Sequence, residues 1–256
     1  MSVQFDLLSS GPTVAAWARK LLQGVERTGC MEDVVCSWSG GKESTLALES
    51  VLRETSFEVA ALMTTAVEGA SRMSIHGVRL ELLERQASAL GFPLDIVRIP
   101  ENATGEKYVQ TMTDVFSGYV ETGVDRLILG DVFAEDDPDF RGTAMESTGL
   151  SSYCPLLDAE TRNLVRRFVS GGYEAVTVAV DESLGREFVG RTVDEEFLEE
   201  LPESADPAGE TGEYHTFVRD GPVFDRRVAF ERGDIVERDT VTGAMVYADL
   251  VPAETA

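Results

Sequence analysis

The feature that most constrains this chain is the junction between an apolar run at residues 33–38 and a helix-patterned segment at 43–54. The two are joined by the string Ser39-Gly40-Gly41-Lys42-Glu43-Ser44. A buried strand, a glycine turn and a helix N-terminus together direct backbone N–H groups and the helix dipole toward one point, which suits a phosphate chain. The junction therefore predicts an α/β fold in which this loop binds phosphate.

The loop is not a Walker A loop, which has Ser or Thr directly after its lysine, whereas Lys42 is followed by Glu43. It resembles instead the pyrophosphate-binding loop of ATP pyrophosphatases, Ser-Gly-Gly-x-Asp-Ser, with Glu43 where Asp is usual. Glycine pairs also occur at ordinary strand–helix junctions, but one of only three lysines in the chain lies inside this turn. Because Lys42 lies in a turn, we expect its replacement by Ala to leave the fold intact.

The chain is strongly acidic. Its 256 residues carry a formal net charge of −24, and 19 of its 22 basic residues are arginine. An acidic surplus with few lysines is typical of halophilic proteins from a high-salt cytoplasm. An acidic face for a basic partner is the alternative, but Asp and Glu are spread along the whole chain. The charge also argues against nonspecific nucleic-acid binding, which needs basic clusters.

The cysteines and the hydropathy pattern favour a reducing, cytoplasmic location. Cys30, Cys36 and Cys154 lie far apart, without Cys-x-x-Cys or metal-ligand spacing. Asp6 interrupts the one candidate secretory leader, and no apolar run approaches the roughly 20 residues of a membrane-spanning helix. We therefore expect a soluble protein without membrane contact.

Strand and helix patterns alternate along most of the chain. They predict a Rossmann-like parallel sheet with helices on both faces, in which ligands bind at the carboxyl ends of the strands. The expected strands are 33–38, 57–65, 94–99, 126–130 and 174–180, and the expected helices are 43–54, 76–90, 106–122, 137–147 and 160–171.

Beyond about residue 190 the pattern changes. There we expect a smaller α+β part with an acidic helix at 194–201, strands near 214–219, 226–231, 234–240 and 244–250, and a hairpin turn at Thr242-Gly243. We divide the chain into an extension at 1–32, a nucleotide-binding domain at 33–155 and a substrate-side region at 156–256. An amphipathic helix at 13–28 could pack on the body of the protein or on a second subunit, so a homodimer stays open.

Both histidines of the chain lie in strings rich in small and charged residues. His76 lies in Arg72-Met73-Ser74-Ile75-His76-Gly77-Val78-Arg79, and His215 follows Gly209-Glu210-Thr211-Gly212-Glu213-Tyr214. A lone histidine is more often structural than catalytic. Because both histidines of the chain lie beside glycine and charged residues, this pattern favours a functional site.

Together with the glycine loop and the two histidine strings, further strings of the chain resemble the diphthine–ammonia ligase family of ATP pyrophosphatases, and within it the bacterial-type members of unassigned substrate. The resemblance covers roughly residues 33–230. Departures are Ala208 where members often carry Cys, Thr211 for Asn and Leu157 for Trp, and Ala208 argues against a catalytic thiol at that position. The strings that carry the resemblance are Ser39–Ser44, Ser74–Arg79, Leu129-Gly130-Asp131, Cys154-Pro155-Leu156, Phe188–Arg191 with Asp194, and Asp206-Pro207-Ala208-Gly209-Glu210-Thr211-Gly212-Glu213-Tyr214-His215-Thr216-Phe217.

The resemblance implies an adenine nucleotide alpha-hydrolase-like fold and an amide-forming ligase that uses ATP and Mg²⁺. A substrate carboxylate would attack the α-phosphorus of ATP, pyrophosphate would leave, and ammonia or another amine would displace AMP. Residues implied in nucleotide binding are Ser39, Gly40, Gly41, Lys42, Ser44, His76, Gly130 and Asp131. Lys42 would also neutralise the pyrophosphate, and Asp131 would hold the metal, unless it only caps the following turn.

The same resemblance places a second group around the acyl acceptor or the amine, where a base with a near-neutral pKa is useful. This group is Glu210, Glu213 and His215. Arg191 would grip a carboxylate or the α-phosphate, unless it only pairs with Asp194.

Two other functions stay open. A nucleotide-binding module without ligase chemistry would lack the lysine and serine of the loop and the string at 206–217. A tRNA-modifying ATP pyrophosphatase would usually bring a basic RNA-binding appendage or paired cysteines, and neither is visible in the sequence. The sequence identifies neither the activated carboxylate nor the nucleophile.

Overall fold

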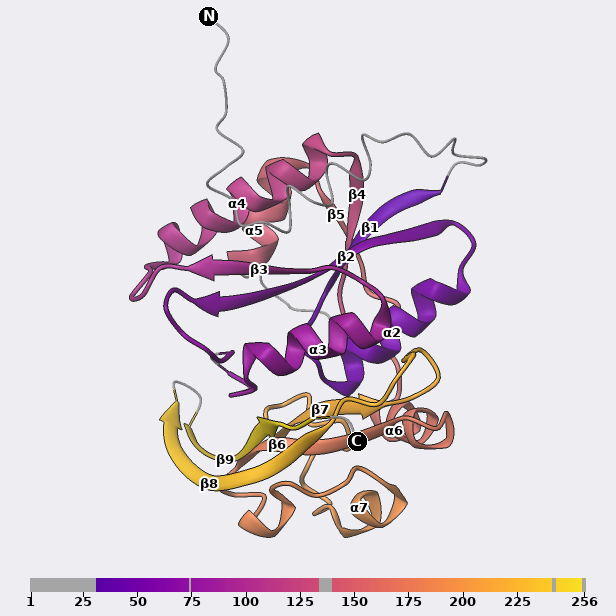
Figure 1. Cartoon of the computed structure of the whole chain (residues 1–256), viewed down its shortest axis with the longest axis vertical. Coiled ribbons are helices and arrows are strands. Elements are labelled where there is room, and N and C mark those ends of the chain that lie inside the picture. The colour runs from indigo at the N-terminus through magenta and orange to yellow at the C-terminus, as the bar shows by residue number, and fades with distance from the viewer. Residues whose placement is uncertain (1–30, 74, 134–139, 241–242, 255–256) are drawn as a thin grey trace, which may run out of the picture.

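The computed structural model describes residues 31–73, 75–133, 140–240 and 243–254. The helix expected at 13–28, and Thr242 of the expected hairpin turn, lie outside the described residues. Two β-sheets make up the described structure, and Figure 1 shows the larger one with its helices in the upper part and the smaller one below. The expected fold class, a parallel α/β sheet followed by a smaller α+β part, is confirmed.

The first sheet contains five parallel strands in the order β3-β2-β1-β4-β5. Val34, Val35 and Cys36 of the central strand β1 are almost fully buried, because helices cover both faces of the sheet. The strand order reverses at β1, so its carboxyl end is the topological switch point where such sheets bind ligands. The strands are β1 (Glu32–Ser37), β2 (Phe57–Val67), β3 (Leu94–Ile99), β4 (Val124–Ile128) and β5 (Ser151–Tyr153).

Four helices cover this sheet. α2 (Lys42–Arg53) and α3 (Leu80–Leu90) share a hydrophobic core that continues into the second sheet. α4 (Gly105–Glu121) and α5 (Phe140–Thr148) pack on the opposite face around a separate core (Figure 1). The expected start of the second helix at residue 76 is wrong, because residues 76–79 form a turn in which Arg79 pairs with Arg72 in a β-bridge.

The second sheet is antiparallel, with the order β7-β6-β9-β8. The run at 174–180, expected beside the parallel strands, is β6 of this sheet. Its six consecutive buried residues are typical of any strand covered on both faces, so periodicity did not reveal which sheet it joins. The elements are α6 (Thr161–Ser170), β6 (Glu174–Asp181), a short 3₁₀ turn (Arg186–Phe188), α7 (Glu195–Glu200), β7 (Tyr214–Asp220), β8 (Phe230–Thr240) and β9 (Gly243–Pro252).

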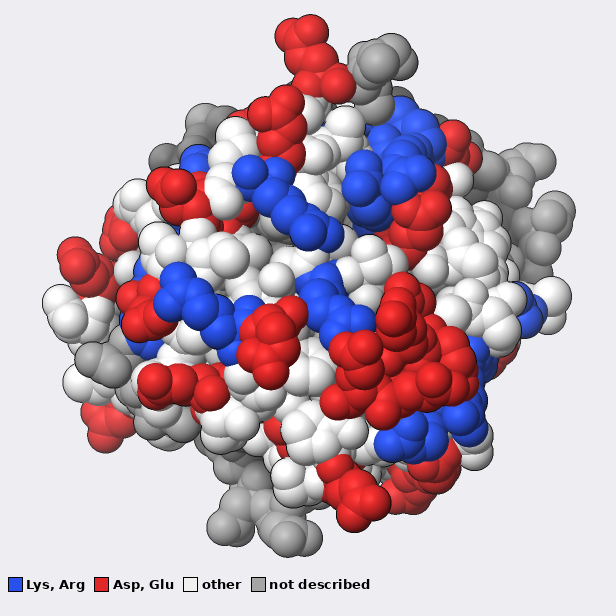
Figure 2. Space-filling model, turned by 90° about the horizontal axis from the view of Figure 1, so that it is seen from below, with Lys and Arg blue, Asp and Glu red and all other residues white. Residues whose placement is uncertain are grey.

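Two surface properties bear on possible partners. Within the described ranges, no helix is both long enough and apolar enough to cross a membrane. The face seen from below in Figure 2 shows arginine side chains scattered among Asp and Glu, with an acidic patch, and no continuous basic stripe on its described part. Nonspecific nucleic-acid binding uses such stripes, so this face does not offer that kind of site.

Candidate active site

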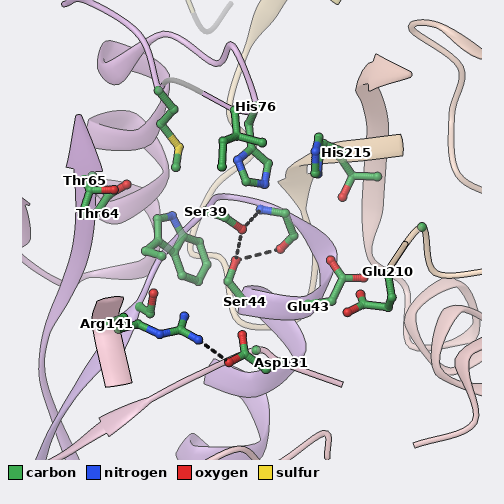
Figure 3. Close-up of a pocket in the computed structure, with 18 of the residues that line it drawn as sticks. Ser39, Glu43, Ser44, Thr64, Thr65, His76, Asp131, Arg141, Glu210 and His215 are labelled. Carbon is green, nitrogen blue, oxygen red and sulfur yellow. Dashed lines mark hydrogen bonds and ion pairs between the residues drawn. The ribbon is translucent and has the colours of Figure 1, made fainter. Parts of the chain in front are cut away.

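A cavity of about 410 Å³ lies at the carboxyl ends of the parallel strands, where the second sheet meets them. One wall comes from the glycine loop, β2 and the end of β4, and the other comes from residues 208–216 before and within β7. Figure 3 shows the polar side chains of both walls facing this space. Among the lining residues are Ser39, Gly41, Glu43, Ser44, His76, Gly130, Asp131, Arg141, Glu210 and His215.

The glycine loop presents hydroxyl and N–H groups to the cavity. Gly41 N–H donates to Ser39 Oγ at 3.2 Å, and the hydroxyls of Ser39 and Ser44 lie 3.2 Å apart (Figure 3). Ser44 Oγ donates to Gly41 O at 3.0 Å. Gly41 takes the N-cap position of α2 and supplies no side-chain cap, and the N–H of Lys42 donates to Thr216, so an anion here would meet the helix dipole and the N–H groups that follow Lys42 in the first turn. Gly130 at the end of β4 lies so close that a Cβ atom there would be 3.0 Å from Ser44 N.

A buried glutamine fixes the left-handed turn of this loop. Gln86 of α3 donates from Nε2 to the carbonyl oxygens of Gly40 at 2.9 Å and Val218 at 2.6 Å, and it accepts from Trp38 Nε1 at 3.0 Å. Gly40 has a φ of +79°, and a Cβ there would lie 2.6 Å from Gln86 Oε1. Sequence reasoning missed Gln86, although a glutamine on the apolar face of a predicted helix was the available signal.

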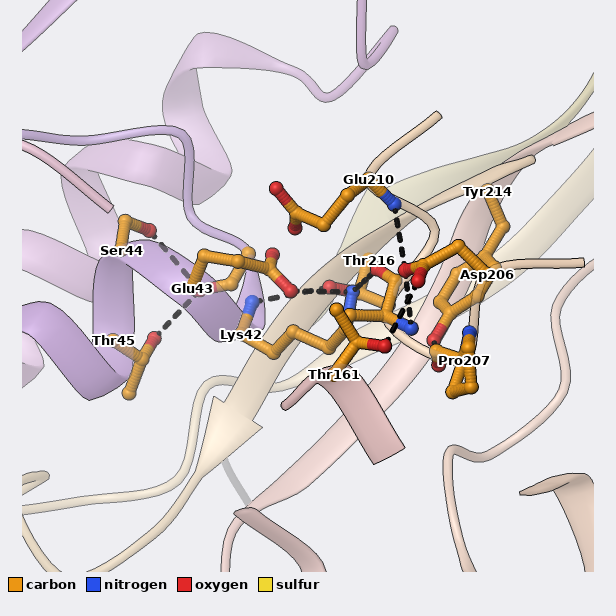
Figure 4. Close-up of polar contacts among 12 residues, drawn as sticks. Lys42, Glu43, Ser44, Thr45, Thr161, Asp206, Pro207, Glu210, Tyr214 and Thr216 are labelled. Carbon is orange, nitrogen blue, oxygen red and sulfur yellow. Dashed lines mark hydrogen bonds and ion pairs between the residues drawn. The ribbon is translucent and has the colours of Figure 1, made fainter. Parts of the chain in front are cut away.

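The side chain of Lys42 does not point into the cavity, where the sequence predicted it. Its side chain is 2% exposed, does not line the cavity, and extends from α2 to the second sheet (Figure 4). Lys42 Nζ donates to the carbonyl of Ala208 at 2.5 Å, pairs with Glu43 at 2.6 Å and lies 4.4 Å from the centre of the Tyr214 ring. Lys42 is the first residue of α2 and is buried, so the premise that it lies in a turn is wrong, and we expect instead that loss of this link between the two walls lowers stability.

The lysine stays charged at this buried position. Burial alone would lower the pKa of Lys42, but the charge of Glu43 and its hydrogen bond outweigh burial, and the pKa is raised above its ordinary value. Its backbone N–H is also used, since it donates to Thr216 Oγ1 of β7 at 3.1 Å. Sequence reasoning gave no role to Thr216 itself, which contacts the loop from a position 174 residues later in the chain.

Carboxylates gather opposite the serines. Burial, followed by the nearby charge of Glu43, raises the pKa of Glu210 to about 7, although Lys42 acts in the other direction. Figures 3 and 4 show the carboxylates of Glu43 and Glu210 beside each other. Asp131 also lines the cavity, and its carboxylate accepts from Arg141 Nη2 at 2.7 Å.

The two histidines of the chain meet in this cavity. Their ring centroids are 4.3 Å apart, although His76 belongs to the turn before α3 and His215 to β7. Burial lowers the pKa of His215 to about 4, helped by the charge of Lys42. Burial also lowers the pKa of His76 well below its usual value, with His215 and Lys42 contributing. Both imidazoles are therefore neutral near pH 7.

Besides Lys42, three predicted site residues lie outside the cavity lining: Glu213, Arg191 and Gly40, whose carbonyl accepts from Gln86. Glu213 closes the loop at 206–213 by accepting from the backbone N–H groups of Asp206 at 2.8 Å and Thr211 at 3.1 Å. Arg191 packs over the Phe197 ring and pairs with Glu200 rather than with Asp194, which caps α7 instead. Sequence reasoning also missed Asp206, whose carboxylate accepts from Ala208 N, Glu210 N and Thr161 Oγ1.

Comparison with known proteins supports one family. The model of the diphthamide synthase N-terminal domain matches residues 32–151, and that of the diphthamide synthase C-terminal domain matches residues 160–245. A search of curated proteins finds no match. The two matches include both walls of the cavity, which confirms the resemblance seen in the sequence. The chain therefore belongs to the diphthamide synthase (diphthine–ammonia ligase) family, whose members are ATP-dependent amidating ligases.

Proposed function

We propose that this cavity joins an amine to a carboxylate at the expense of ATP, with AMP and pyrophosphate as the leaving products. The observation that carries the proposal is that phosphate-binding donors and proton-accepting side chains line one space from two different sheets. Such a reaction depends on holding a carboxylate oxygen in line with the α-phosphorus and the leaving pyrophosphate, and on holding the amine beside the carboxyl carbon from which AMP then departs.

The glycine loop is the phosphate side of the proposed site. Ser39 and Ser44 line the cavity with hydroxyl groups that would exchange their present hydrogen bonds within the loop for phosphate oxygens, and the N-terminus of α2 supplies a favourable dipole for the departing pyrophosphate. Trp38, Met63 and Met112 line the same cavity and offer an apolar surface for the adenine. Lys42 contributes positive charge from behind the loop, while its ammonium holds the opposite wall at Ala208.

The residues of this site fit a Mg²⁺ ion that is also bound by phosphate oxygens and water. Among the described residues, no three His, Cys, Asp or Glu side chains are arranged to hold a metal by themselves. Mg²⁺ at nucleotide sites uses one or two carboxylates together with phosphate oxygens and water, so Asp131 would suffice as its protein ligand. The ion would supply neutralisation of phosphate charge, and Asp131 would then share its carboxylate between the ion and Arg141.

Glu210 and the histidine pair form the proposed acceptor side. A carboxylate with a pKa of about 7 can take the proton that an attacking amine releases as the new C–N bond forms and AMP departs. His215 and His76, neutral near pH 7, can donate hydrogen bonds to a carboxylate or phosphate oxygen. The activated carboxylate could belong to a small molecule or to a protein side chain.

The two alternative functions receive less support. A nucleotide-binding module without ligase chemistry has no use for Glu210 and two histidines opposite its phosphate loop. A tRNA-modifying pyrophosphatase would bring a basic appendage, and the face seen in Figure 2 is mixed in charge. Ligase chemistry accounts for both walls of the cavity.

Product analysis tests the proposal directly. The protein is incubated with ATP, a cell extract and an amine source at high salt, and AMP, pyrophosphate and new amides are followed by chromatography and mass spectrometry. AMP and pyrophosphate are expected in equal amounts. ADP and orthophosphate as the direct products, in an assay free of pyrophosphatase, would contradict the proposal.

His215→Ala distinguishes the roles of the two walls in nucleotide binding and in product formation. We expect this variant to bind a non-hydrolysable ATP analogue with wild-type affinity in calorimetry, but to form product roughly 100-fold more slowly, as for loss of an acid–base group. If His215 only secures β7, its replacement should instead lower Tm by several degrees and leave turnover intact. That second outcome would assign His215 to the scaffold.

A further inference from the structure

The turn that carries His76 has few contacts of its own that could fix the imidazole. Within the turn, Met73 N–H donates to Val78 O at 2.9 Å, and Gly77 N–H donates to Met73 O at 3.2 Å. The Nδ1 atom of His76 is buried and has no hydrogen-bond partner among the described residues. The position of the ring therefore depends on where the backbone of the turn is held.

A carboxylate of β9 holds both ends of this turn. Asp249 accepts from Arg79 Nη2 at 2.6 Å and Nε at 3.1 Å, and from Arg72 Nη2 at 2.8 Å. A second nitrogen of Arg72 donates to the carbonyl of Gly77 at 3.0 Å. Arginine–carboxylate pairs with two parallel hydrogen bonds fix orientation as well as distance. The side chain of Asp249 thus ties residues 72 and 79 to one point on the second sheet.

Tyr247, two residues earlier on β9, contacts the turn on both sides of His76. Its hydroxyl donates to Ile75 O at 3.1 Å, and a Cβ at Gly77 would lie 2.7 Å from the tyrosine ring. Tyr247 pairs with Ala179 of β6, and Ala179 pairs in turn with His215 of β7. Paired residues of antiparallel strands share a face of the sheet. One row across the sheet therefore carries both His215 and the residue on which the His76 turn rests.

We propose that Asp249 is a positioning residue, which acts through the turn at 72–79 to hold His76 against His215. It does not line the cavity, and it lies outside the family match at 160–245. The consequence for catalysis rests on the proposed function. The geometric part, that Asp249 sets the place of His76, does not depend on any reaction.

The test uses the fact that the chain has two histidines, which give two imidazole signals in a heteronuclear NMR spectrum of the whole protein. Asp249→Asn is compared with Glu231→Gln, which changes an exposed carboxylate on the neighbouring strand β8. In Asp249→Asn we expect both signals to move, because the two rings are in contact, and in Glu231→Gln we expect neither to move. Unchanged imidazole signals in a folded Asp249→Asn protein would overturn the inference.

A second arm measures turnover. Asp249→Asn should lower kcat roughly 10- to 100-fold, as expected when a reacting group is misplaced by about 1 Å. In a His76→Ala background, Asp249→Asn should have no further effect, because the residue through which it acts is gone. A full additional loss in that background would refute a role through His76. If wild-type protein shows no ATP turnover, the proposed function fails and the NMR arm still decides the inference.

Tyr247→Phe covers the case in which Asp249→Asn does not fold. This change removes only the hydroxyl that donates to Ile75 O and keeps the ring under Gly77. The His76 signal should move more than the His215 signal, since the lost bond is to the neighbouring residue. Arg79→Lys, which keeps the charge but loses the paired hydrogen bonds to Asp249, is measured beside it and should also move the His76 signal. An unmoved His76 signal in both folded variants would overturn the inference.

Discussion

The two walls of the cavity are built in opposite ways. The glycine-loop wall takes its donors from consecutive residues, 39–44, between one strand and one helix. The opposite wall takes Glu210 from a loop and His215 from β7. His76 contacts His215 from a turn that lies within residues 32–151, the N-terminal domain match. The first wall depends on local backbone geometry, and the second depends on how the two sheets pack.

Lys42 connects these two kinds of structure. It comes from the local motif, yet its ammonium contacts Glu43, the Ala208 carbonyl and the Tyr214 ring. Thr216 and Gln86 add two further hydrogen-bonded links between the glycine loop and β7. The comparison teaches that the glycine loop is both a phosphate site and the contact through which the second sheet is held.

The largest effect is expected for Lys42→Ala. The change leaves Glu43 and the neighbouring Glu210 without their buried counter-charge, so we expect the free energy of unfolding to fall by about 3–5 kcal/mol. Chemical denaturation measures this loss. Lys107→Ala, which removes an exposed lysine near the start of α4, is the matched control and should change stability by less than about 0.5 kcal/mol. Equal stability of the two variants would mean that the walls do not depend on Lys42.

A smaller effect is expected for Gly40→Ala. The new methyl group would meet Gln86 and Leu83 at 2.6 Å in a backbone with φ of +79°. Left-handed backbone and overpacking together should cost roughly 2–4 kcal/mol and weaken nucleotide binding. Gly69→Ala is the matched control, since Gly69 has a φ of +77° and open space around it. It should cost only about 1–2 kcal/mol and leave the affinity for the nucleotide analogue unchanged.

The comparison also explains what the sequence could predict. The strand, turn and helix at 33–54, most of the parallel sheet and the α+β part were predicted, because they depend on apolar periodicity and on glycine positions. The separate strands expected near 226–231 and 234–240 are wrong, since residues 226–229 are irregular and one strand, β8, covers 230–240. The short strand β5 was missed, since three residues carry too little pattern. The strand at 174–180 was placed in the wrong sheet, because burial on both faces looks the same in either sheet.

The site was predicted less evenly, and the failures lie where side chains reach between sheets. Ser39, Ser44, Asp131, Glu210 and both histidines do line one cavity, whereas Gly40, Lys42, Glu213 and Arg191 do not. The last three are long side chains whose direction is set by partners in different settings: a carbonyl 166 residues away for Lys42, an irregular loop for Glu213 and the end of α7 for Arg191. Their partners, Ala208 for Lys42 and Glu200 for Arg191, carry no signal that a sequence pattern could supply.

The smallest expected effect is a pH dependence of stability and turnover that comes from Glu210, in the wall formed by residues 208–216. The pKa of Glu210 is about 7 in the folded protein, mainly through burial, against an ordinary value of 4.5. Between these two values Glu210 binds more protons in the folded state than in the unfolded state, so its contribution to the free energy of unfolding should fall as pH rises from about 4.5 to 7 and level off above. Turnover should rise over the same window, because only ionised Glu210 can accept a proton.

The Glu210 contribution to stability and the turnover should therefore change in opposite directions. The two histidines act on stability in the opposite sense to Glu210, because burial lowers their pKa in the folded protein and their contribution to the free energy of unfolding rises as pH approaches the ordinary value of 6.5. The Glu210 contribution is therefore measured as the difference between the wild type and Glu210→Gln, which should lack the contribution that falls toward pH 7 and should turn over more slowly at all pH values. Glu203→Gln, an exposed change before β7, should keep the wild-type pH profile. A transition near pH 7 that survives in Glu210→Gln would assign it to another group and remove the proposed base from the second wall.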